Sequence, residues 1–172
     1  KLVVKAWTQL GNALRLIGRY AEAETALARA GAIPISDLPT SIHLIEVQAS
    51  LHRNTGSYDC AACLLGCAIG AEEALGNPAG KARLYIQLGI VELDAGHRPR
   101  AFRCFRTALD LLTPASPPDL LIAAGHNMFQ TLIAAGRLSA ASAALAGLEP
   151  TYRRLNAPRI EAKAEWLRAR LY

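Results

Sequence analysis

Residues 7–30 read WTQLGNALRLIGRYAEAETALARA, and this stretch decides the fold. Apolar side chains recur in it at helical spacing, with Gly18 between the two runs. The pattern predicts a helix over residues 1–18 and a second helix over residues 20–32. The link Gly-Arg-Tyr is too short for anything but an antiparallel pair, so we expect a helical hairpin.

The same pattern returns three more times, at spacings of 38, 40 and 40 residues. Each copy has a glycine suited to ending a helix, followed by a small, a large and another apolar residue. The glycines are Gly18, Gly56, Gly96 and Gly136, and the residues that follow them are Ala23, Leu27 and Ala30; Ala61, Leu65 and Ala68; Ala101, Phe105 and Ala108; and Ala141, Leu145 and Leu148. The fourth copy keeps only its trailing helix well. A register held over four copies indicates a repeat architecture.

Trp7, Leu10 and Gly11, followed by Tyr20 and Ala23, resemble the tetratricopeptide repeat, a helical hairpin of about 34 residues. The third unit repeats much of this pattern at Tyr85, Leu88, Gly89, Ala101, Phe105 and Ala108. The wider spacing is similar to that of long-helix bacterial multi-repeat proteins. The resemblance implies an all-α fold, a right-handed superhelical solenoid of antiparallel helix pairs with about nine helices.

We expect one tetratricopeptide-repeat domain over residues 1–172. Links that contain Pro34, Pro78 and residues 116–119 set the boundaries between units. The sequence opens at Lys1 without a Met and ends on what reads as an unfinished unit, so we expect a fragment of a larger protein. The expected units are 1–37, 38–77, 78–116 and 117–156, followed by a terminal half-unit or capping helix at 157–172.

Composition and charge narrow the function classes. The net charge is +5, but the arginines are dispersed and the chain is 52% hydrophobic. This balance favours an acidic protein or peptide partner over nucleic acid, because no base-reading module accompanies the basic residues. The longest apolar run, residues 60–71, is too short to insert into a membrane. One basic cluster lies near the end of the chain, at Arg153, Arg154, Arg159, Arg168 and Arg170.

The four cysteines, Cys60, Cys63, Cys67 and Cys104, predict free thiols in a reducing, cytoplasmic setting. The first three share one helix face, and we interpret them as small residues that fill a tight helix interface. A straight helix separates the first from the third by about 10 Å, too far for one metal ion. We therefore predict no metal site, and a redox role stays open.

No arrangement of residues indicates catalysis. His43, His52, His97 and His126 are scattered, and none has a Cys, Ser or Asp partner at a catalytic spacing. The acidic pair Glu72–Glu73 reads as the solvated end of a long helix. The glycines fall between helices or, as at Gly11 and Gly89, at close-packing positions, and they form no phosphate-binding loop. We predict no enzyme and no cofactor.

The resemblance implies a peptide-binding groove lined by the leading helix of each hairpin. By register, the groove residues are Lys5, Thr8, Gln9, Asn12 and Arg15 in the first unit; His43, Glu46, Val47, Ser50 and Arg53 in the second; Arg83, Ile86 and Gln87 in the third; and His126, Asn127 and Gln130 in the fourth. Amide and guanidinium groups in this set can hydrogen-bond a peptide main chain.

Some members of the family clamp a partner's C-terminal carboxylate with Lys, Asn and Arg at fixed positions of the groove. Those positions hold Thr8, Asn12, Val47, Arg83 and Gln87 here. Asn12 matches the pattern and Arg83 is a cation, but Val47 has no side-chain donor. We therefore do not expect this clamp.

The function predicted from sequence is a protein- or peptide-binding scaffold within a larger bacterial regulatory or assembly protein. One alternative is a ligand-sensing domain that switches an attached output domain. The other is self-association into a homo-oligomer, through the apolar edge of the last unit or through Trp166 and Leu167.

Overall fold

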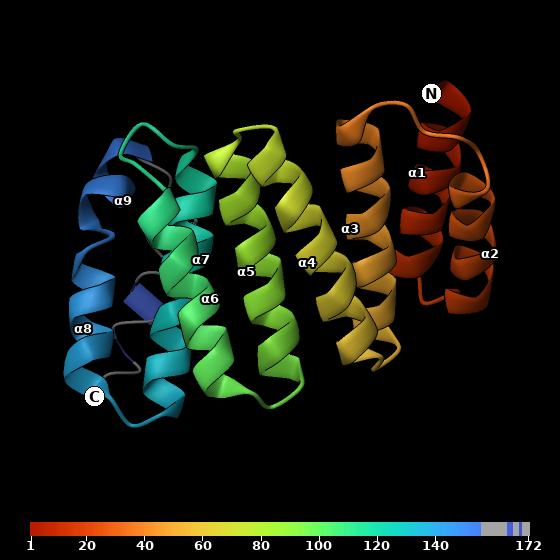
Figure 1. Cartoon of the computed structure of the whole chain (residues 1–172). Coiled ribbons are helices and arrows are strands. Elements are labelled where there is room, and N and C mark those ends of the chain that lie inside the picture. The colour runs from red at the N-terminus through yellow and green to blue at the C-terminus, as the bar shows by residue number, and fades with distance from the viewer. Residues whose placement is uncertain (156–164, 167–168, 170–172) are drawn as a thin grey trace. The chain divides into compact units, whose positions relative to one another are not determined.

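The computed structural model describes residues 1–155, 165–166 and 169, and every regular element in them is helical. Figure 1 shows the helices following one another as antiparallel pairs. This confirms the all-α prediction. The helices are α1 (Leu2–Leu16), α2 (Tyr20–Gly31), α3 (Leu38–Asn54), α4 (Tyr58–Ala74), α5 (Pro78–Asp94), α6 (Arg98–Leu111), α7 (Pro118–Ala134), α8 (Leu138–Ala146) and α9 (Glu149–Leu155).

The turn between the two helices of each pair depends on a glycine in the left-handed region. Gly18 has φ of 79°, which an L side chain rarely adopts, and it lets the chain reverse between α1 and α2. Gly56, Gly96 and Gly136 do the same in the other three hairpins, with φ of 78°, 83° and 69°. The four turns read from the sequence are thus confirmed.

Within a hairpin, a glycine on the leading helix admits a large side chain from the trailing helix. A Cβ added at Gly11 would lie 2.7 Å from Leu27 Cδ2, and one added at Gly89 would lie 2.4 Å from Phe105 Cε1. Leu27 and Phe105 are fully buried as a result. The close-packing role predicted for Gly11 and Gly89 is confirmed.

In the fourth hairpin the leading helix also packs closely at a glycine, but its large and small residues are exchanged in position. By register, Phe129 takes the place of Gly11 and Gly89, while Gly125 takes the place of Trp7 and Tyr85. Phe129 is fully buried, and a Cβ at Gly125 would lie 2.6 Å from Leu148 Cδ1. The leading helix of this unit therefore differs from the repeat pattern and still packs closely. Its glycine and its aromatic residue occupy each other's positions relative to the first and third units.

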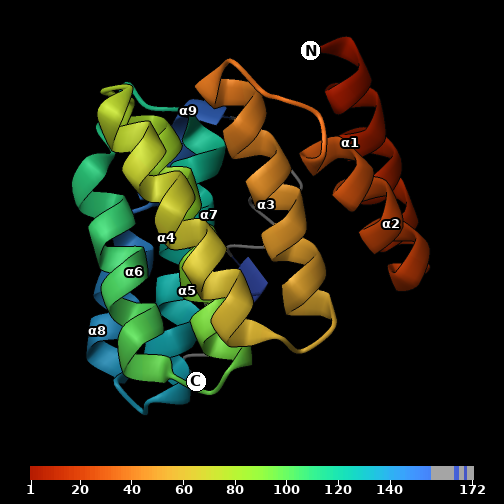
Figure 2. The same ribbon diagram turned by 45° about the vertical axis from the view of Figure 1, so that its right-hand side comes forward.

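The chain forms two compact units, which we describe separately. Unit 1 contains residues 1–77 and 94–96, and unit 2 contains residues 78–93 and the described part of 97–172. In unit 1, α3 packs against both α1 and α2, as Figure 2 also shows. The core of unit 1 is built from Val4, Ala23, Leu27, Ala30, Leu44, Val47 and Leu51. Unit 2 has a core around Phe105 and a second around Phe129, Leu132, Leu145 and Tyr152.

Helix α3 begins with a side-chain cap. Asp37 Oδ1 accepts hydrogen bonds from the Thr40 backbone N–H at 3.1 Å and from the Thr40 hydroxyl at 2.7 Å. These bonds satisfy a donor that the first helical turn would otherwise leave unpaired, and Pro39 fits the first turn because its missing N–H is not needed there. The start of α3 beside α1 is therefore well fixed.

The last described helices lie within residues 117–156, the range expected for unit four. Helix α8 is short, ending at Ala146, and α9 begins at Glu149 and packs against α7. The terminal helix predicted for residues 157–172 lies outside the described residues, apart from helical positions at 165–166 and 169. Of the C-terminal arginines, Arg153 is exposed. Over the described part of the chain, no helix is long and apolar enough to cross a membrane.

Candidate functional site

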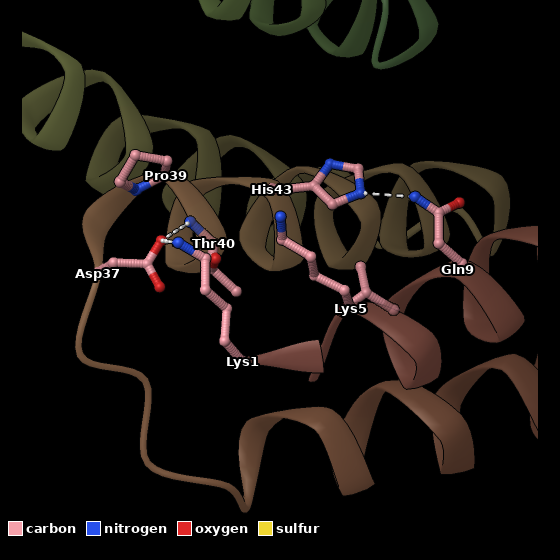
Figure 3. A pocket seen from close by; sticks show the side chains of 8 residues that line it. Lys1, Lys5, Gln9, Asp37, Pro39, Thr40 and His43 are labelled. Atoms are coloured by element: carbon pink, nitrogen blue, oxygen red, sulfur yellow. Dashed lines mark hydrogen bonds and ion pairs between the residues drawn. The ribbon is translucent and has the colours of Figure 1, made fainter. Parts of the chain in front are cut away.

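Helices α1 and α3 of unit 1 enclose a pocket of about 250 Å³. It contains four residues that the repeat register assigned to a groove: Lys5, Thr8, Gln9 and His43. Figure 3 shows the side chains of α1 and α3 converging on it. The other lining residues are Lys1, Asp37, Pro39 and Thr40.

Helical periodicity explains why these residues meet. Lys1, Lys5 and Thr8 follow one another at intervals of one turn, and they therefore share one face of α1. Thr40 and His43 are related in the same way on α3, which lies against α1. The pocket thus forms between the leading helices of consecutive hairpins.

A polar contact joins the two walls of the pocket. Gln9 Nε2 lies 3.2 Å from His43 Nε2, and the amide donates when the ring carries its proton on Nδ1. Both residues are accessible, Gln9 being exposed and His43 half-buried. A ligand main chain could exchange hydrogen bonds with either group without leaving a buried donor unpaired.

The pocket is positively charged overall. Its one carboxylate, Asp37, is already engaged, since it caps α3 and lies 3.3 Å from Lys1 Nζ. The hydrogen bond from the Thr40 hydroxyl, helped by the Thr40 backbone N–H and by Lys1, lowers the pKa of Asp37 below its ordinary value. Lys5 is exposed and extends from α1 toward His43 in Figure 3. The accessible charge that remains favours an anionic ligand group.

Further along α1, the predicted residues Asn12 and Arg15 hold each other in place. Arg15 donates to Asn12 Oδ1 from Nε at 3.2 Å and from Nη2 at 2.8 Å. Burial lowers the pKa of Arg15 below its ordinary value, and the positive charge of Arg53 lowers it further. Arg53 and Ser50, both half-buried, lie on α3, and Arg53 Nε is 3.6 Å from Asp94 Oδ2 of the same unit. Arg15 therefore extends the basic character beyond the pocket, whereas Asp94 offsets the charge of Arg53.

One register position of the predicted groove is buried in every unit. Thr8, Glu46, Ile86 and His126 correspond to one another, and all four are buried, with exposed fractions of 1%, 6%, 5% and 3%. Each faces the interior of its unit, so none offers a free side chain to a ligand. Thr8 forms only the floor of the pocket, because its hydroxyl donates to the Val4 carbonyl at 2.8 Å, and His126 Nε2 contacts the Tyr152 hydroxyl. Val47 is likewise a core residue of unit 1 rather than a groove residue.

The remaining predicted residues belong to unit 2. Arg83 and Gln87 are half-buried on α5, and Gln130 is exposed on α7. Asn127 donates to the Ala123 carbonyl at 2.8 Å and so uses its amide within its own helix. None of these four side chains lines the pocket between α1 and α3.

The cysteine interpretation was also wrong. Cys60, Cys63 and Cys67 are exposed, because the face of α4 that packs inward carries Ala61, Leu65, Ala68 and Ile69 instead. Only Cys104 is partly covered, and burial raises its pKa to about 11. In the described part of the chain no group of three His, Cys, Asp or Glu side chains could hold a metal ion.

The two acidic side chains at the end of α4, predicted to be solvated, differ in exposure. Glu73 is exposed, but Glu72 is buried, with an exposed fraction of 4%. Glu72 Oε2 accepts a hydrogen bond from Asn77 Nδ2 at 2.9 Å. Glu72 therefore helps to fix the turn after α4.

Four pocket residues were not predicted from the sequence: Lys1, Asp37, Pro39 and Thr40. The last three were missed because residues 34–41 were interpreted as a link between units. One signal was present. An Asp three residues before a Thr, with a Pro between them, is typical of a capped helix start. The start of a leading helix lies beside the preceding leading helix, so a cap there contributes to the groove.

Comparisons with known proteins bear on the fold. No family model and no curated protein matches the sequence. Two crystal structures of nearly identical TPR-like repeats, assigned to a kinesin light chain of Podosopora anserina, are 14% identical to this chain. The match to the first structure covers 98% of this chain and 92% of the other chain, with a TM-score of 0.71. The match to the second, a substituted form, covers 97% of this chain and 93% of the other chain, with a TM-score of 0.68. BtubC (BKLC) from P. vanneervenii is 15% identical over 91% of this chain and 82% of its own, with a TM-score of 0.53. At such identities the likeness establishes the fold.

Proposed function

On the premise that this chain has the fold of a TPR-like helical repeat solenoid, we propose that it is a scaffold that binds an acidic protein or peptide segment. The observation that carries the proposal is the pocket between α1 and α3, where Lys5, Gln9 and His43 converge. The pocket combines an accessible cation with groups that pair with a peptide main chain.

The binding mode follows from these groups. A carboxylate of the partner lies against Lys5, while Gln9 and His43 exchange hydrogen bonds with the partner's main chain. Arg15, whose hydrogen-bond partner Asn12 is neutral, attracts a second acidic residue further along α1. Because the lysine is exposed, its contribution is mainly to association rate and specificity, and it weakens as salt screens the charges.

The setting we propose is a regulatory or assembly protein of the bacterial cytoplasm. The Ala-, Leu- and Arg-rich composition supports a bacterial source, and three exposed thiols support a reducing compartment. In this setting the chain presents a surface for a partner and carries out no chemistry of its own.

A selection experiment tests the proposal without assuming a partner. The purified chain is used to select binders from a random peptide library, and the dissociation constants of the enriched peptides are then measured. We expect enrichment of Asp and Glu, and a loss of affinity of about tenfold in Lys5→Glu. The matched control is Arg106→Glu, an exposed charge reversal on α6 of unit 2, which should leave affinity unchanged. Enrichment of basic peptides, or equal affinity in Lys5→Glu, would contradict the proposal.

One observation favours self-association as a second function. Val3 and Leu10 on α1, and Ile17 directly after its end, repeat every seven residues, and 58%, 46% and 67% of their surfaces are exposed. Their register counterparts are polar: Ser41 and Gln48 on α3, and Thr55 directly after its end. A surface of this kind is typical of an interface, and the occupant we propose is a second copy of the chain. The sequence had placed this contact at the other end, on the last unit.

Light scattering over a concentration series tests this second function. We expect the wild-type mass to rise toward that of a dimer with concentration, and Leu10→Glu to remain monomeric. Thr25→Glu, on the exposed side of α2, introduces the same charge outside the face and should associate as the wild type does. A monomeric mass for the wild type throughout the series would eliminate self-association through α1.

A further inference from the structure

Unit 2 contains a second pocket, of about 350 Å³, that the repeat register did not predict. It lies between the start of α6 and the end of α7. Trailing helix α6 forms one wall, which distinguishes it from the pocket of unit 1, where both walls are leading helices. The lining residues are Arg98, Pro99, Phe102, Arg103, Thr131, Leu132, Ala135 and Arg137.

The floor of this pocket is apolar. Phe102 is half-buried and Leu132 buried, and Pro99 and Ala135 add hydrocarbon surface around them. Thr131 contributes little polarity, because its hydroxyl donates to the Asn127 carbonyl at 2.8 Å. The surface thus suits a hydrocarbon group better than an inorganic ion.

The rim is cationic. Arg98, Arg103 and Arg137 are all exposed, and no acidic side chain is among the described residues that line the pocket. An acid of the same unit, Glu92 on α5, is engaged by His97 at 2.9 Å and by Arg100 at 4.0 Å. The Arg137 guanidinium lies 6.0 Å from the centre of the Phe102 ring, so one cation is held over the apolar floor.

From this arrangement we propose that the α6–α7 pocket binds a small organic carboxylate with an aromatic or branched aliphatic group. The hydrocarbon group lies on Phe102 and Leu132. The carboxylate accepts hydrogen bonds from Arg103 and Arg137, since a guanidinium fork matches the geometry of two carboxylate oxygens. The volume is within the range of small-molecule sites, which starts at about 300 Å³. This site is independent of the peptide site proposed for unit 1.

Titrations followed by amide chemical shifts test the proposal on the whole chain. The probe is 4-phenylbutyrate, with 4-phenylbutanol and inorganic phosphate as comparisons that lack either the charge or the hydrocarbon. We expect 4-phenylbutyrate to cause saturable shifts at the start of α6 and the end of α7. The alcohol and phosphate should bind with affinities lower than that of the acid by about tenfold or more. A blocked peptide with Asp beside Phe distinguishes a free carboxylate from a peptide side chain.

Variants distinguish binding in the pocket from non-specific attraction of an anion to a basic surface. The double variant Arg103→Gln/Arg137→Gln should weaken 4-phenylbutyrate binding by about tenfold, while Arg106→Gln, exposed on the same helix but outside the pocket, should not. Phe102→Ala should weaken both the acid and the alcohol. Equal binding of acid and alcohol, unchanged affinity in the double variant, or arginine-dependent binding of the peptide alone would each overturn the proposal.

Discussion

Gly89 and Gly66 both lie within helices, yet their surroundings differ completely. Gly89 is covered by the ring of Phe105, which is itself fully buried and cannot move aside. Gly66, on the outer side of α4, has nothing within 4 Å of a Cβ. The first glycine is required by packing, and the second lowers helix stability without a packing reason.

Alanine substitutions at these two sites should therefore have opposite effects. Gly89→Ala forces a Cβ against Phe105, and we expect a loss of about 1–3 kcal/mol in the free energy of unfolding. Gly66→Ala should gain up to about 1 kcal/mol, because alanine has the higher helix propensity. Urea denaturation of the two variants measures both. A gain in Gly89→Ala would show that the hairpin is looser than described.

The four thiols should divide into two classes of reactivity. Cys60, Cys63 and Cys67 are exposed, whereas Cys104 is partly buried with a pKa raised to about 11. Because the thiolate is the reactive form, we expect three fast equivalents and one slower by about tenfold or more with a thiol-specific chromogenic reagent at about pH 8. Cys104→Ala should remove only the slow phase. Slow reaction of the α4 thiols would restore the packing interpretation.

At the scale of elements, the start of α3 connects stability to pH. Asp37 is hydrogen-bonded to Thr40 in its charged form, and its pKa is lowered from the ordinary value. A group with a lowered pKa stabilises the folded state above its unfolded pKa, and it loses that effect as pH falls through the folded pKa. The relevant range therefore begins near about pH 4 and extends downward.

Asp37→Asn keeps a side-chain acceptor but removes the charge. We expect the wild type to be more stable than this variant at about pH 7, and the difference to shrink as pH falls below about 4 and the carboxyl becomes protonated. Glu24→Gln, an exposed acid on α2, controls for the general effect of removing a negative charge. Chemical denaturation at several pH values gives the comparison. A difference in stability that stays the same from about pH 7 to the acid end of the series would mean that the carboxylate charge is not what stabilises α3.

Features of the helices that depend on local backbone conformation could be predicted from the sequence, whereas features that depend on packing between elements could not. Turn glycines such as Gly18 were predictable because a local backbone conformation requires them. The pairing of Gly125 with Leu148 was not predictable, because it depends on how the volumes of α7 and of the turn after α8 fit together. The outward direction of Cys60 also escaped prediction, since alanine, leucine and cysteine are all compatible with a buried face.

At the scale of the molecule, the register predicted four of the residues that line the pocket between α1 and α3, but not how accessible each side chain is. Lys5, Gln9 and His43 do meet in one pocket. Thr8, only one residue from Gln9, faces the core, because adjacent helical positions differ by about 100° in direction. A spacing copied between repeats fixes which positions correspond, but the rotation of each helix decides which of them are accessible.

We propose that α1 and α3 together bind an acidic partner. The most direct test is to map, by amide chemical shifts, where the tightest peptide from the library selection binds. We expect the largest shifts around Lys5, Gln9, Thr40 and His43, and smaller shifts in Lys5→Glu. Shifts confined to the outer faces of α2 and α4, or to α6 and α7 of unit 2, would contradict it.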